Sequence, residues 1–374
     1  MANRTWALVA GGGTAGHLNP GLAVARALVQ AGHPAADIHF VGAARGPESE
    51  LVPAAGFSVD VLPGRGIQRK LTVANFGAIV DLVRAMASGI AIVRRRRPSV
   101  VVVLGGYASF ACGVGAVLAR VPLVLMEQNA KAGAVNRVLR RFASASAVSF
   151  AGTDLPRSTV TGNPLRVEIR ELAEQPDRDA ARADARKELG LPLDRIVVAV
   201  FAGSLGSRRI NDAVLGLVER WRDRSDVAIR HVIGRYGYSS GSDPMPALPP
   251  DGLVYQVVPY EDRMHLLLAA ADVAVTRSGG SVFELMASGL PAILVPLPIA
   301  PRDHQAANAA SVVAAGGAIA VVDQEFDTDR LERELGGLLA HPDRLLAMSE
   351  AMRAAATVDA AERVARVIEG VARG

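Results

Sequence analysis

A glycine-rich stretch followed by a histidine lies close to the beginning of the chain. Gly11-Gly12-Gly13-Thr14-Ala15-Gly16 follows the apolar run 6–10 and precedes a helical pattern, and His17 comes directly after it. Glycines let a backbone approach a ligand closely, and the helix amino terminus behind them favours an anion or developing negative charge. Because imidazole titrates near neutral pH, His17 is a candidate general base. A structural, hydrogen-bonded histidine at the start of a helix is the alternative.

The same stretch also matches the dinucleotide-binding pattern G-x-G-x-x-G. That pattern expects an acidic residue at the end of the second strand, but here the strand ends at Gly42-Ala43-Ala44, and Asp37 begins it instead. A nicotinamide-dependent oxidoreductase therefore remains only as a less favoured alternative.

Two polar stretches in the second half of the chain also follow apolar runs. In Gly203-Ser204-Leu205-Gly206-Ser207, backbone N–H groups and the Ser204 hydroxyl could hold a diphosphate at a helix amino terminus. Glu284 ends the stretch 277–284 and falls on the first turns of the next expected helix. A carboxylate at that place can bind both hydroxyls of a ribose, or it can serve as a helix cap.

A third polar stretch, Asp303 to Asn308, includes Gln305 and offers side chains that could recognise sugar hydroxyls. His304 lies in it, but no partner is suitably spaced for a metal site. Asp177-Arg178-Asp179 spells D-x-D, yet it lies in a charged segment far from the glycine turns, so we interpret it as solvated helix. We therefore expect neither a catalytic metal nor a cofactor.

Apolar runs of strand length alternate with helical stretches along most of the chain. The expected strands are 6–10, 38–42, 59–62, 100–104, 123–126 and 147–150, then 196–201, 228–233, 254–258, 273–276, 292–295 and 318–322. This alternation predicts an α/β protein with two Rossmann-like parallel-sheet domains and helices on both faces of each sheet. We expect the ligand in an interdomain cleft, outside the carboxyl ends of the strands.

The alternation stops near Asn163 to Arg166, where a polar segment, 168–188, begins, and it then restarts with a strand, a glycine turn and a helix. We predict an N-terminal domain of residues 1–166 and a C-terminal domain of residues 167–355. The last helix, about 356–374, is expected to pack back on the first domain.

Composition narrows the setting of the protein. Half of the 374 residues are apolar, and Cys112 is the only cysteine, which excludes an intrachain disulfide and fits a reducing compartment. No signal peptide is visible at the start. Residues 98–119 carry no charge and are long enough to cross a bilayer, but Gly105 and Gly106 interrupt them, which indicates a buried strand, turn and helix.

Positive charge is concentrated in the first half, although the formal net charge is only +4. Arg94 to Arg97 form the densest run. They could end a helix, where the dipole favours cations, or attract anionic lipid or phosphate. Nucleic acid is disfavoured, because no aromatic residues interleave with these charges as stacking platforms.

The ordered set of motifs resembles the MurG family, the glycosyltransferases that add N-acetylglucosamine to lipid I in peptidoglycan synthesis. The resemblance covers nearly the whole chain. The matching stretches are 11–20, 105–109, 127–129 with 132–133 and Asn136, 162–166, 203–207, Glu284 and 303–308. The chain departs from the commonest family pattern at Met126, Ala202, Leu205 and Ala306.

The resemblance implies a metal-independent, inverting enzyme of the GT-B fold. Its donor would be UDP-N-acetylglucosamine, and its acceptor would be O4 of the N-acetylmuramoyl(pentapeptide) unit of undecaprenyl-diphosphate-linked lipid I, which gives lipid II. It would act peripherally, at the cytoplasmic face of the plasma membrane, in cell-wall biogenesis, cell shape and division.

The family's site residues carry over to matching positions of this chain. Those implied for the donor are Thr14, Ala15 and Gly16 with Asn129 at the sugar, Arg166 and Ser204 at the diphosphate, Glu284 at the ribose and Gln305 at the sugar hydroxyls. His17 would be the catalytic base. Gly105, Gly106, Tyr107 and Glu127 would face the acceptor, and Tyr260 or Glu261 would neighbour the uracil.

A lipid acceptor suggests a role for the basic first half. Apolar residues at 67, 71, 73, 76 and 79 lie among Arg65, Arg69 and Lys70 and would form an amphipathic membrane-facing patch, or else a helix packed on the core. The residues leave three other functions open: another GT-B UDP-sugar transferase, a UDP-sugar epimerase, and a non-catalytic nucleotide-sugar-binding protein.

Overall fold

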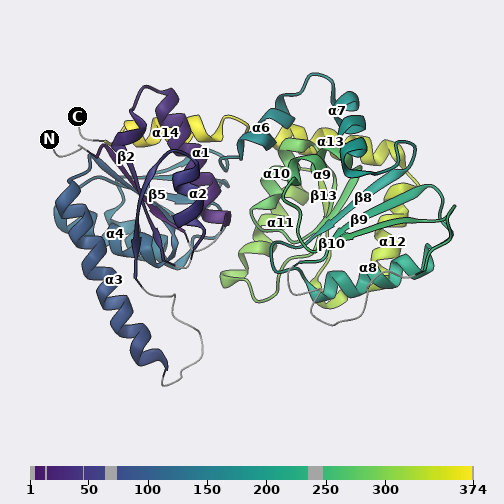
Figure 1. Ribbon diagram of the computed structural model, residues 1–374, viewed down its shortest axis with the longest axis horizontal. Coiled ribbons are helices and arrows are strands. Elements are labelled where there is room, and N and C mark those ends of the chain that lie inside the picture. The colour runs from purple at the N-terminus through teal and green to yellow at the C-terminus, as the bar shows by residue number, and fades with distance from the viewer. Residues whose placement is uncertain (1–4, 13–14, 45, 64–73, 235–246, 373–374) are drawn as a thin grey trace. The chain divides into compact units, whose positions relative to one another are not determined.

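The structure is a computed structural model that describes residues 5–12, 15–44, 46–63, 74–234 and 247–372. The chain divides into two compact units, Met1–Arg166 with Thr357–Gly374, and Val167–Ala356 (Figure 1). Thr14 and residues 64–73 lie outside the described residues, and the side chains of Ala15 and 74–82 are not described. The expected amphipathic patch at 67–79 and the contact expected of Thr14 therefore stay predictions.

In the described part of the first unit, seven parallel strands form one sheet in the order β3-β2-β1-β4-β5-β6-β7. The strands are β1 (Ala7–Gly11), β2 (Ile38–Ala43), β3 (Ser58–Leu62), β4 (Val100–Gly105), β5 (Leu123–Glu127), β6 (Ala145–Val148) and β7 (Ser158–Val160). The helices are α1 (Ala15–Gln30), α2 (Glu48–Ala54), α3 (Ala74–Arg96), α4 (Gly106–Ala119), α5 (Ala134–Leu139) and α14 (Ala360–Glu369), with short 3-10 turns at Ala35–Asp37 and Arg140–Phe142.

Successive strand residues point to opposite faces of this sheet, and helices cover both faces, so residues on both faces are apolar. On one face, Val9 packs in a core with residues of α1 and α14. On the other face, Leu8 and Ala10 pack in a core with residues of α3 and α4. Uninterrupted apolar strands such as Val100 to Leu104 follow from this double burial.

In the described part of the second unit, six parallel strands are ordered β10-β9-β8-β11-β12-β13. The strands are β8 (Ile196–Phe201), β9 (Val227–Val232), β10 (Val254–Val258), β11 (Val273–Thr276), β12 (Ala292–Leu294) and β13 (Ala318–Ala320). The helices are α6 (Val167–Glu174), α7 (Arg178–Leu189), α8 (Arg208–Arg220), α9 (Met264–Ala270), α10 (Ser281–Ser288), α11 (His304–Ala314), α12 (Thr328–Leu339) and α13 (Pro342–Ala355), with 3-10 turns at Pro301–Asp303 and Asp323–Glu325.

The predicted α/β class with two parallel-sheet domains is confirmed, and most expected strands agree with the observed ones to within two residues. One strand was missed: β7 has exposed side chains throughout, so no apolar run marks it. The polar segment 168–188 forms α6 and most of α7. Asp177 to Asp179, interpreted as solvated helix, lie at the start of α7, where Asp177 is the N-cap and Asp179 is in the first turn.

The uncharged segment 98–119 is a strand, a glycine turn and a helix, as expected, because it forms β4 and α4. Among the described residues, no helix combines the length and apolar character that a membrane span requires.

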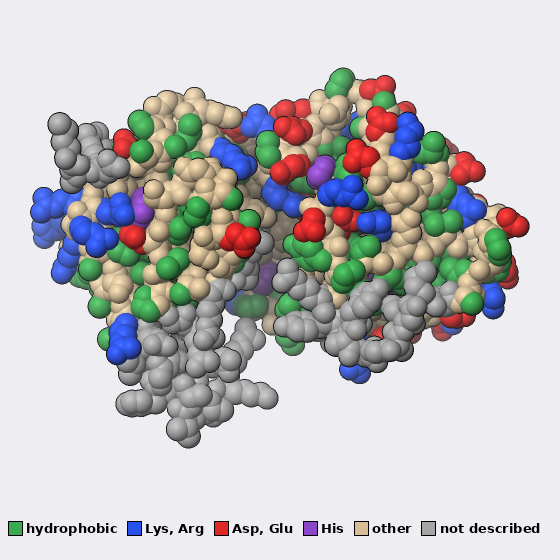
Figure 2. Space-filling model, in the orientation of Figure 1, with side chains coloured by type: hydrophobic (Ala, Val, Ile, Leu, Met, Phe, Trp, Pro, Cys, Tyr) green, Lys and Arg blue, Asp and Glu red, His purple; other side chains and the backbone are tan. Residues whose placement is uncertain are grey.

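The arginine run ends a helix. Arg94, Arg95 and Arg96 form the last turn of α3, where the dipole favours cations, and Figure 2 shows Lys and Arg side chains gathered on this face of the first unit. Arg95 and Arg96 approach the Asp60 carboxylate to 3.5 and 3.2 Å. Part of this charge is therefore neutralised within the unit.

The C-terminal helix α14 completes the core of the first unit, so its buried face should matter for stability. Ile368 is fully buried in the core shared with α1, and we expect Ile368→Ala to lower the free energy of unfolding by about 2–5 kcal/mol through the cavity it leaves. Arg366→Ala, at an exposed position of the same helix, should change it by less than about 0.5 kcal/mol. Urea unfolding of both variants tests this; equal losses would contradict the packing of α14.

Candidate active site

The central strands of each sheet meet where the strand order reverses. In the first unit these are β1 and β4, whose last residues, Gly11 and Gly105, are register partners. In the second unit they are β8 and β11. Ligands of open α/β sheets bind outside the carboxyl ends of the strands at this point. The glycine stretches singled out in the sequence follow these four strands.

His17 lies against the end of β4. It is half-buried in the first turn of α1, and a Cβ atom added to Gly105 would come within 3.1 Å of its Cδ2 and Nε2 atoms. Gly105 has φ 114° and Gly106 has φ 86°, and a Cβ on Gly106 would lie 2.9 Å from the carbonyl oxygen of Gly12. Glycine is therefore required here for backbone conformation and for space.

Hydrogen bonds fix the ends of these two strands to each other. The hydroxyl of Ser109, a fully buried residue of α4, donates to the carbonyl oxygen of Ala10. The same hydroxyl oxygen accepts from the Gly105 N–H over 3.0 Å. The Tyr107 hydroxyl, expected to face the acceptor, donates to the carbonyl oxygen of Leu62 over 3.1 Å. In this structure Tyr107 therefore ties α4 to the end of β3.

Glu48 was not among the residues predicted from the sequence. It is 1% exposed, and its side chain occupies the space where Cβ atoms of Gly12, Gly42 and Gly46 would lie. The buried Glu48 carboxylate thus packs directly against Gly12, at the start of the glycine-rich stretch that follows β1. The position of Glu48, just after the glycine-containing end of β2, is the signal that could have indicated it.

Glu127 organises the loop that follows β5. Its buried carboxylate accepts hydrogen bonds from the Asn129 N–H and side-chain amide (3.1 and 3.2 Å), the Gly133 N–H (2.8 Å) and the Asn136 side-chain amide (2.9 Å). The structure therefore brings Glu127 and Asn129 together, with Glu127 orienting the loop that carries Asn129. Direct contact of either residue with a substrate stays a prediction.

Arg277 ties together four chain segments at the carboxyl edge of the second sheet. Its guanidinium donates to Ser207 Oγ (2.6 Å), to the carbonyl oxygens of Val295 and Pro296 (2.9 and 3.2 Å) and to Asp323 Oδ1 (2.6 Å). Ser207 in turn caps α8, because its Oγ accepts from the Ile210 N–H. The loop ends after β8, β11, β12 and β13 are thus held in one arrangement.

Ser204 is exposed on the loop that Arg277 and Ser207 anchor, directly before the amino terminus of α8. That position suits contact with an anionic ligand. Arg166, the other residue predicted at the diphosphate, is half-buried at the end of the first unit's main segment. That both hold one diphosphate stays a prediction.

A buried chain of polar side chains supports the same loop from inside. His231 is fully buried, its Nδ1 lies 2.9 Å from the Tyr255 hydroxyl, and its Nε2 lies 3.1 Å from Asn211 Oδ1. Asn211 donates to the carbonyl oxygen of Ile233, and a Cβ on Gly206 would collide with that same oxygen. Burial lowers the pKa of His231 to about 4, so the imidazole is neutral near pH 7.

Gln305 and the loop after β11 lie together. The Gln305 side-chain oxygen accepts from the Leu297 N–H (3.0 Å), and its carbonyl oxygen accepts from the Ser278 hydroxyl (2.7 Å). Its amide nitrogen would be 3.8 Å from a Cβ on Gly279. Glu284 is half-buried in the first turn of α10, as expected. The structure thus places Gln305 and the start of α10 around one loop.

The turn before Gln305 has an unusual backbone. Arg302 and Asp303 both have positive φ values, 56° and 55°, which residues other than glycine rarely adopt and which cluster at functional sites. His304 donates through Nδ1 to the carbonyl oxygen of Pro301 over 2.9 Å. This bond gives His304 a structural role at the start of α11.

The remaining sequence candidates have local explanations. Asp177 caps α7 by accepting from the Ala180 N–H (2.9 Å). Within the described residues, no group of three or more His, Cys, Asp or Glu is placed to hold a metal ion. Glu261, predicted near the uracil, is 6% exposed, and its Oε2 binds the Arg230 guanidinium at 2.6 Å. Its carboxylate therefore serves this buried ion pair.

Comparisons with known proteins agree with the division of the chain into two units. Residues 7–148 match the Glycosyltransferase family 28 N-terminal domain, and residues 197–364 match the Glycosyltransferase family 28 C-terminal domain. An N-acetylglucosamine transferase of Clavibacter sepedonicus is 41% identical over 96% of this chain and 95% of its own length. One from Desulforudis audaxviator is 36% identical over 98% of both chains. The crystal structure of Acinetobacter baumannii MurG superposes with a TM-score of 0.75 at 25% identity, covering 98% of this chain and 99% of that one.

The fold and the two matched domains define a glycosyltransferase of the GT-B architecture that uses a UDP-sugar. More narrowly, the chain belongs to the MurG family, whose curated members are named UDP-N-acetylglucosamine--N-acetylmuramyl-(pentapeptide) pyrophosphoryl-undecaprenol N-acetylglucosamine transferase.

The buried His231 should make stability depend on pH. Its folded pKa of about 4 lies below the ordinary value of 6.5, so the unfolded chain binds more protons in this window and stability falls as the pH falls through it. We expect His231 alone to lower the free energy of unfolding by about 2 kcal/mol between pH 7 and pH 5. Urea unfolding at both pH values measures this.

Two variants isolate the contribution of this histidine. His231→Gln should remove that part of the pH dependence, whereas His341→Gln, at an exposed histidine of the same unit, should keep it. An unchanged pH dependence in His231→Gln would show that His231 is not the responsible group.

Proposed function

We propose that this protein transfers N-acetylglucosamine from UDP-N-acetylglucosamine to O4 of the N-acetylmuramoyl(pentapeptide) unit of undecaprenyl-diphosphate-linked lipid I, with inversion at the anomeric carbon, and so forms lipid II for the cell wall. The observation that carries the proposal is the extent of the match: relatives named for this activity share both units over nearly their whole length. The glycine turns at both points of strand-order reversal supply the places where a nucleotide-sugar can meet backbone N–H groups.

In the proposed reaction, the acceptor O4 attacks the anomeric carbon of the donor sugar while His17 takes the hydroxyl proton. The bond from that carbon to the phosphate oxygen breaks, and UDP leaves with the bonding electrons. Negative charge that develops on the diphosphate is stabilised by N–H groups of the loop 203–207, by the amino terminus of α8 and by Arg166. No metal ion is needed for these steps.

The proposed donor groups depend on interactions already present in the second unit. Arg277 holds Ser207 and thus the loop with Ser204, so the diphosphate-binding N–H groups are ordered before a ligand arrives. We assign the ribose hydroxyls to Glu284 and the sugar hydroxyls to Gln305. In the first unit we assign the donor sugar to Ala15, Gly16 and Asn129, and the acceptor side to Gly105 and Gly106.

We further propose that the protein acts peripherally at the cytoplasmic face of the plasma membrane, because the proposed acceptor carries an undecaprenyl chain. The exposed arginine Arg94 at the end of α3 supports attraction to an anionic bilayer surface.

The transfer itself is tested by following UDP release from UDP-N-acetylglucosamine with and without a short-chain lipid I analogue. We expect release only with the analogue, together with a disaccharide product. Donor turnover without any acceptor would indicate an epimerase or a hydrolase instead. Thermal shifts with UDP-N-acetylglucosamine and with NAD(P) provide the binding control, and stabilisation by NAD(P) alone would contradict the proposed donor.

The role of His17 is tested by His17→Ala. Loss of a general base typically lowers turnover by about 10²- to 10⁴-fold, and we expect a loss of that size in kcat with little change in the Kd of the donor. His341→Ala, at an exposed histidine, should leave both values unchanged. Unchanged turnover in a folded His17→Ala variant would remove His17 from the mechanism.

A further inference from the structure

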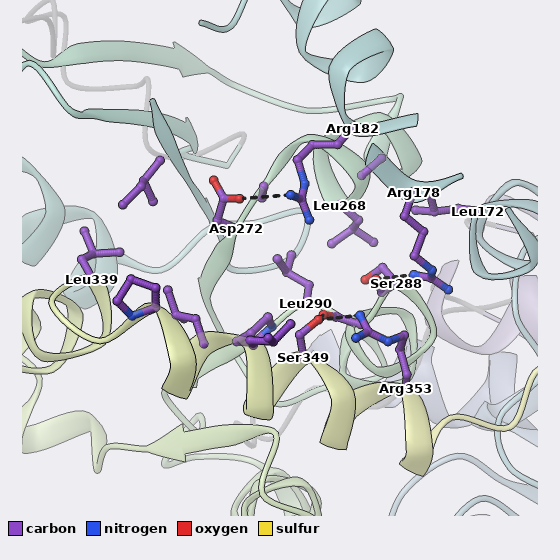
Figure 3. A pocket seen from close by; sticks show the side chains of 18 residues that line it. Leu172, Arg178, Arg182, Leu268, Asp272, Ser288, Leu290, Leu339, Ser349 and Arg353 are labelled. Atoms are coloured by element: carbon purple, nitrogen blue, oxygen red, sulfur yellow. Dashed lines mark hydrogen bonds and ion pairs between the residues drawn. The ribbon is translucent and has the colours of Figure 1, made fainter. Parts of the chain in front are cut away.

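The second unit contains a cavity at the amino ends of its strands (Figure 3). The proposed donor site lies at the other, carboxyl ends. It measures about 370 Å³, within the range of small-molecule pockets. Its lining includes Ile196, Asp272 and Pro291, which begin or directly precede β8, β11 and β12. The cavity therefore lies at the amino ends of the strands, whereas the loop 203–207 and residue Glu284 follow their carboxyl ends.

Most of the cavity wall is apolar. Leucines come from four surrounding segments: Leu172 of α6, Leu268 of α9, Leu290 before β12, and Leu339 of α12. Leu345 of α13 adds to the same wall. A ligand that fills this space must bring an apolar body.

Three arginines also line the cavity: Arg178 and Arg182 of α7, and Arg353 of α13. Arg178 donates to the carbonyl oxygens of Ser288 (2.9 Å) and Ala173 (2.7 Å), and Arg353 donates to Ser349 Oγ (2.6 Å). In the part of the chain that the structure describes, neither Arg178 nor Arg353 has a carboxylate within ion-pair distance. Figure 3 shows both arginines on the same side of the cavity.

Asp272, the acidic residue that lines the cavity, does not neutralise the positive charges of Arg178 and Arg353. Asp272 lies 2.7 Å from Arg186 through Oδ2, and its Oδ1 is 3.9 Å from Arg182. The buried Nε of Arg182 has no hydrogen-bond partner. Burial lowers the pKa of Arg178, and the positive charge of the nearby Arg353 lowers it further. Both effects are expected for like charges held close together in a partly desolvated cavity.

We propose that this cavity binds an amphipathic anion, with a phosphate or carboxylate head held by Arg178 and Arg353 and an apolar body against the leucine wall. Guanidinium groups suit such heads because their N–H donors match two oxygen atoms at once. The site differs from the donor site in position and in chemistry, since it offers side-chain cations and apolar walls instead of backbone N–H groups at a helix start.

Calorimetric titration of the full-length protein tests the site, with octyl phosphate and octanoate as separate probes in monomeric form and saturating UDP present to occupy the donor site. We expect saturable binding of one equivalent of at least one probe, with inorganic phosphate and octanol each binding at least about tenfold more weakly because each lacks one half of the recognition. The stronger of the two probes identifies whether the head is a phosphate or a carboxylate.

Variants separate this site from general charge effects. Arg353→Gln should weaken probe binding about tenfold through loss of a charge-assisted contact. Arg333→Gln, which removes an exposed arginine from α12 in the same unit, should leave binding unchanged. Leu345→Gln, in the apolar wall, should weaken octyl phosphate but not inorganic phosphate.

The proposal is overturned if neither probe binds the folded protein in the presence of saturating UDP, or if inorganic phosphate binds as tightly as the stronger probe. It is equally overturned if Arg353→Gln binds like the unchanged protein. Because the readout is binding in the presence of UDP, these outcomes do not depend on whether the transfer reaction has been assigned correctly.

Discussion

Close packing against the backbone of glycines at the strand exits is the constraint on which both units depend. Gly105 can end β4 against the ring of His17, and Gly106 can follow against the carbonyl oxygen of Gly12, only because neither has a side chain. In the second unit, Gly206 lies as closely against the carbonyl oxygen of Ile233. These contacts bring loops from neighbouring strands together, so polar groups far apart in the sequence meet at the carboxyl edge of each sheet.

Buried polar interactions then determine how those groups are oriented. Glu127 accepts hydrogen bonds from three donors of the loop after β5 and one in α5. Arg277 joins four segments after the strands of the second sheet, and neutral His231 bridges Tyr255 and Asn211 next to the loop 203–207. Such groups must be paired when they are buried, and the pairing leaves little freedom to the loops that carry them. Order at the reacting edge therefore comes from side chains that need not touch a substrate.

The sequence predicted the parts of the structure that depend on local pattern. Apolar runs followed by glycine turns indicated most of the strands and the glycine-containing loops at their carboxyl ends, since these signals lie within a few neighbouring residues. The strand order, and with it the points where the order reverses, came from the structure. Glu48 and His231 were not predicted, because their roles depend on contacts with distant segments, such as those of Glu48 with Gly12 and of His231 with Asn211 and Tyr255. The hydrogen bond from the Tyr107 hydroxyl to the end of β3 is likewise a contact between distant segments. That Tyr107 faces the acceptor stays a prediction. The sequence pattern therefore predicts where a loop lies. Tertiary packing decides which side chains hold that loop in place.

The two ends of the second sheet are suited to anions for different physical reasons. At the carboxyl ends, the positive potential comes from unsatisfied N–H groups at the start of α8, and Arg277 there is already neutralised by Asp323 at 2.6 Å. At the amino ends of the strands, helices α6 and α10 end and present carbonyl oxygens. Arg178 donates to one of each, Ala173 and Ser288, while its net charge persists. Hydrogen bonds to neutral carbonyls compensate the desolvation of a guanidinium only in part, so the charge of Arg178, close to Arg353, remains available to a negatively charged partner.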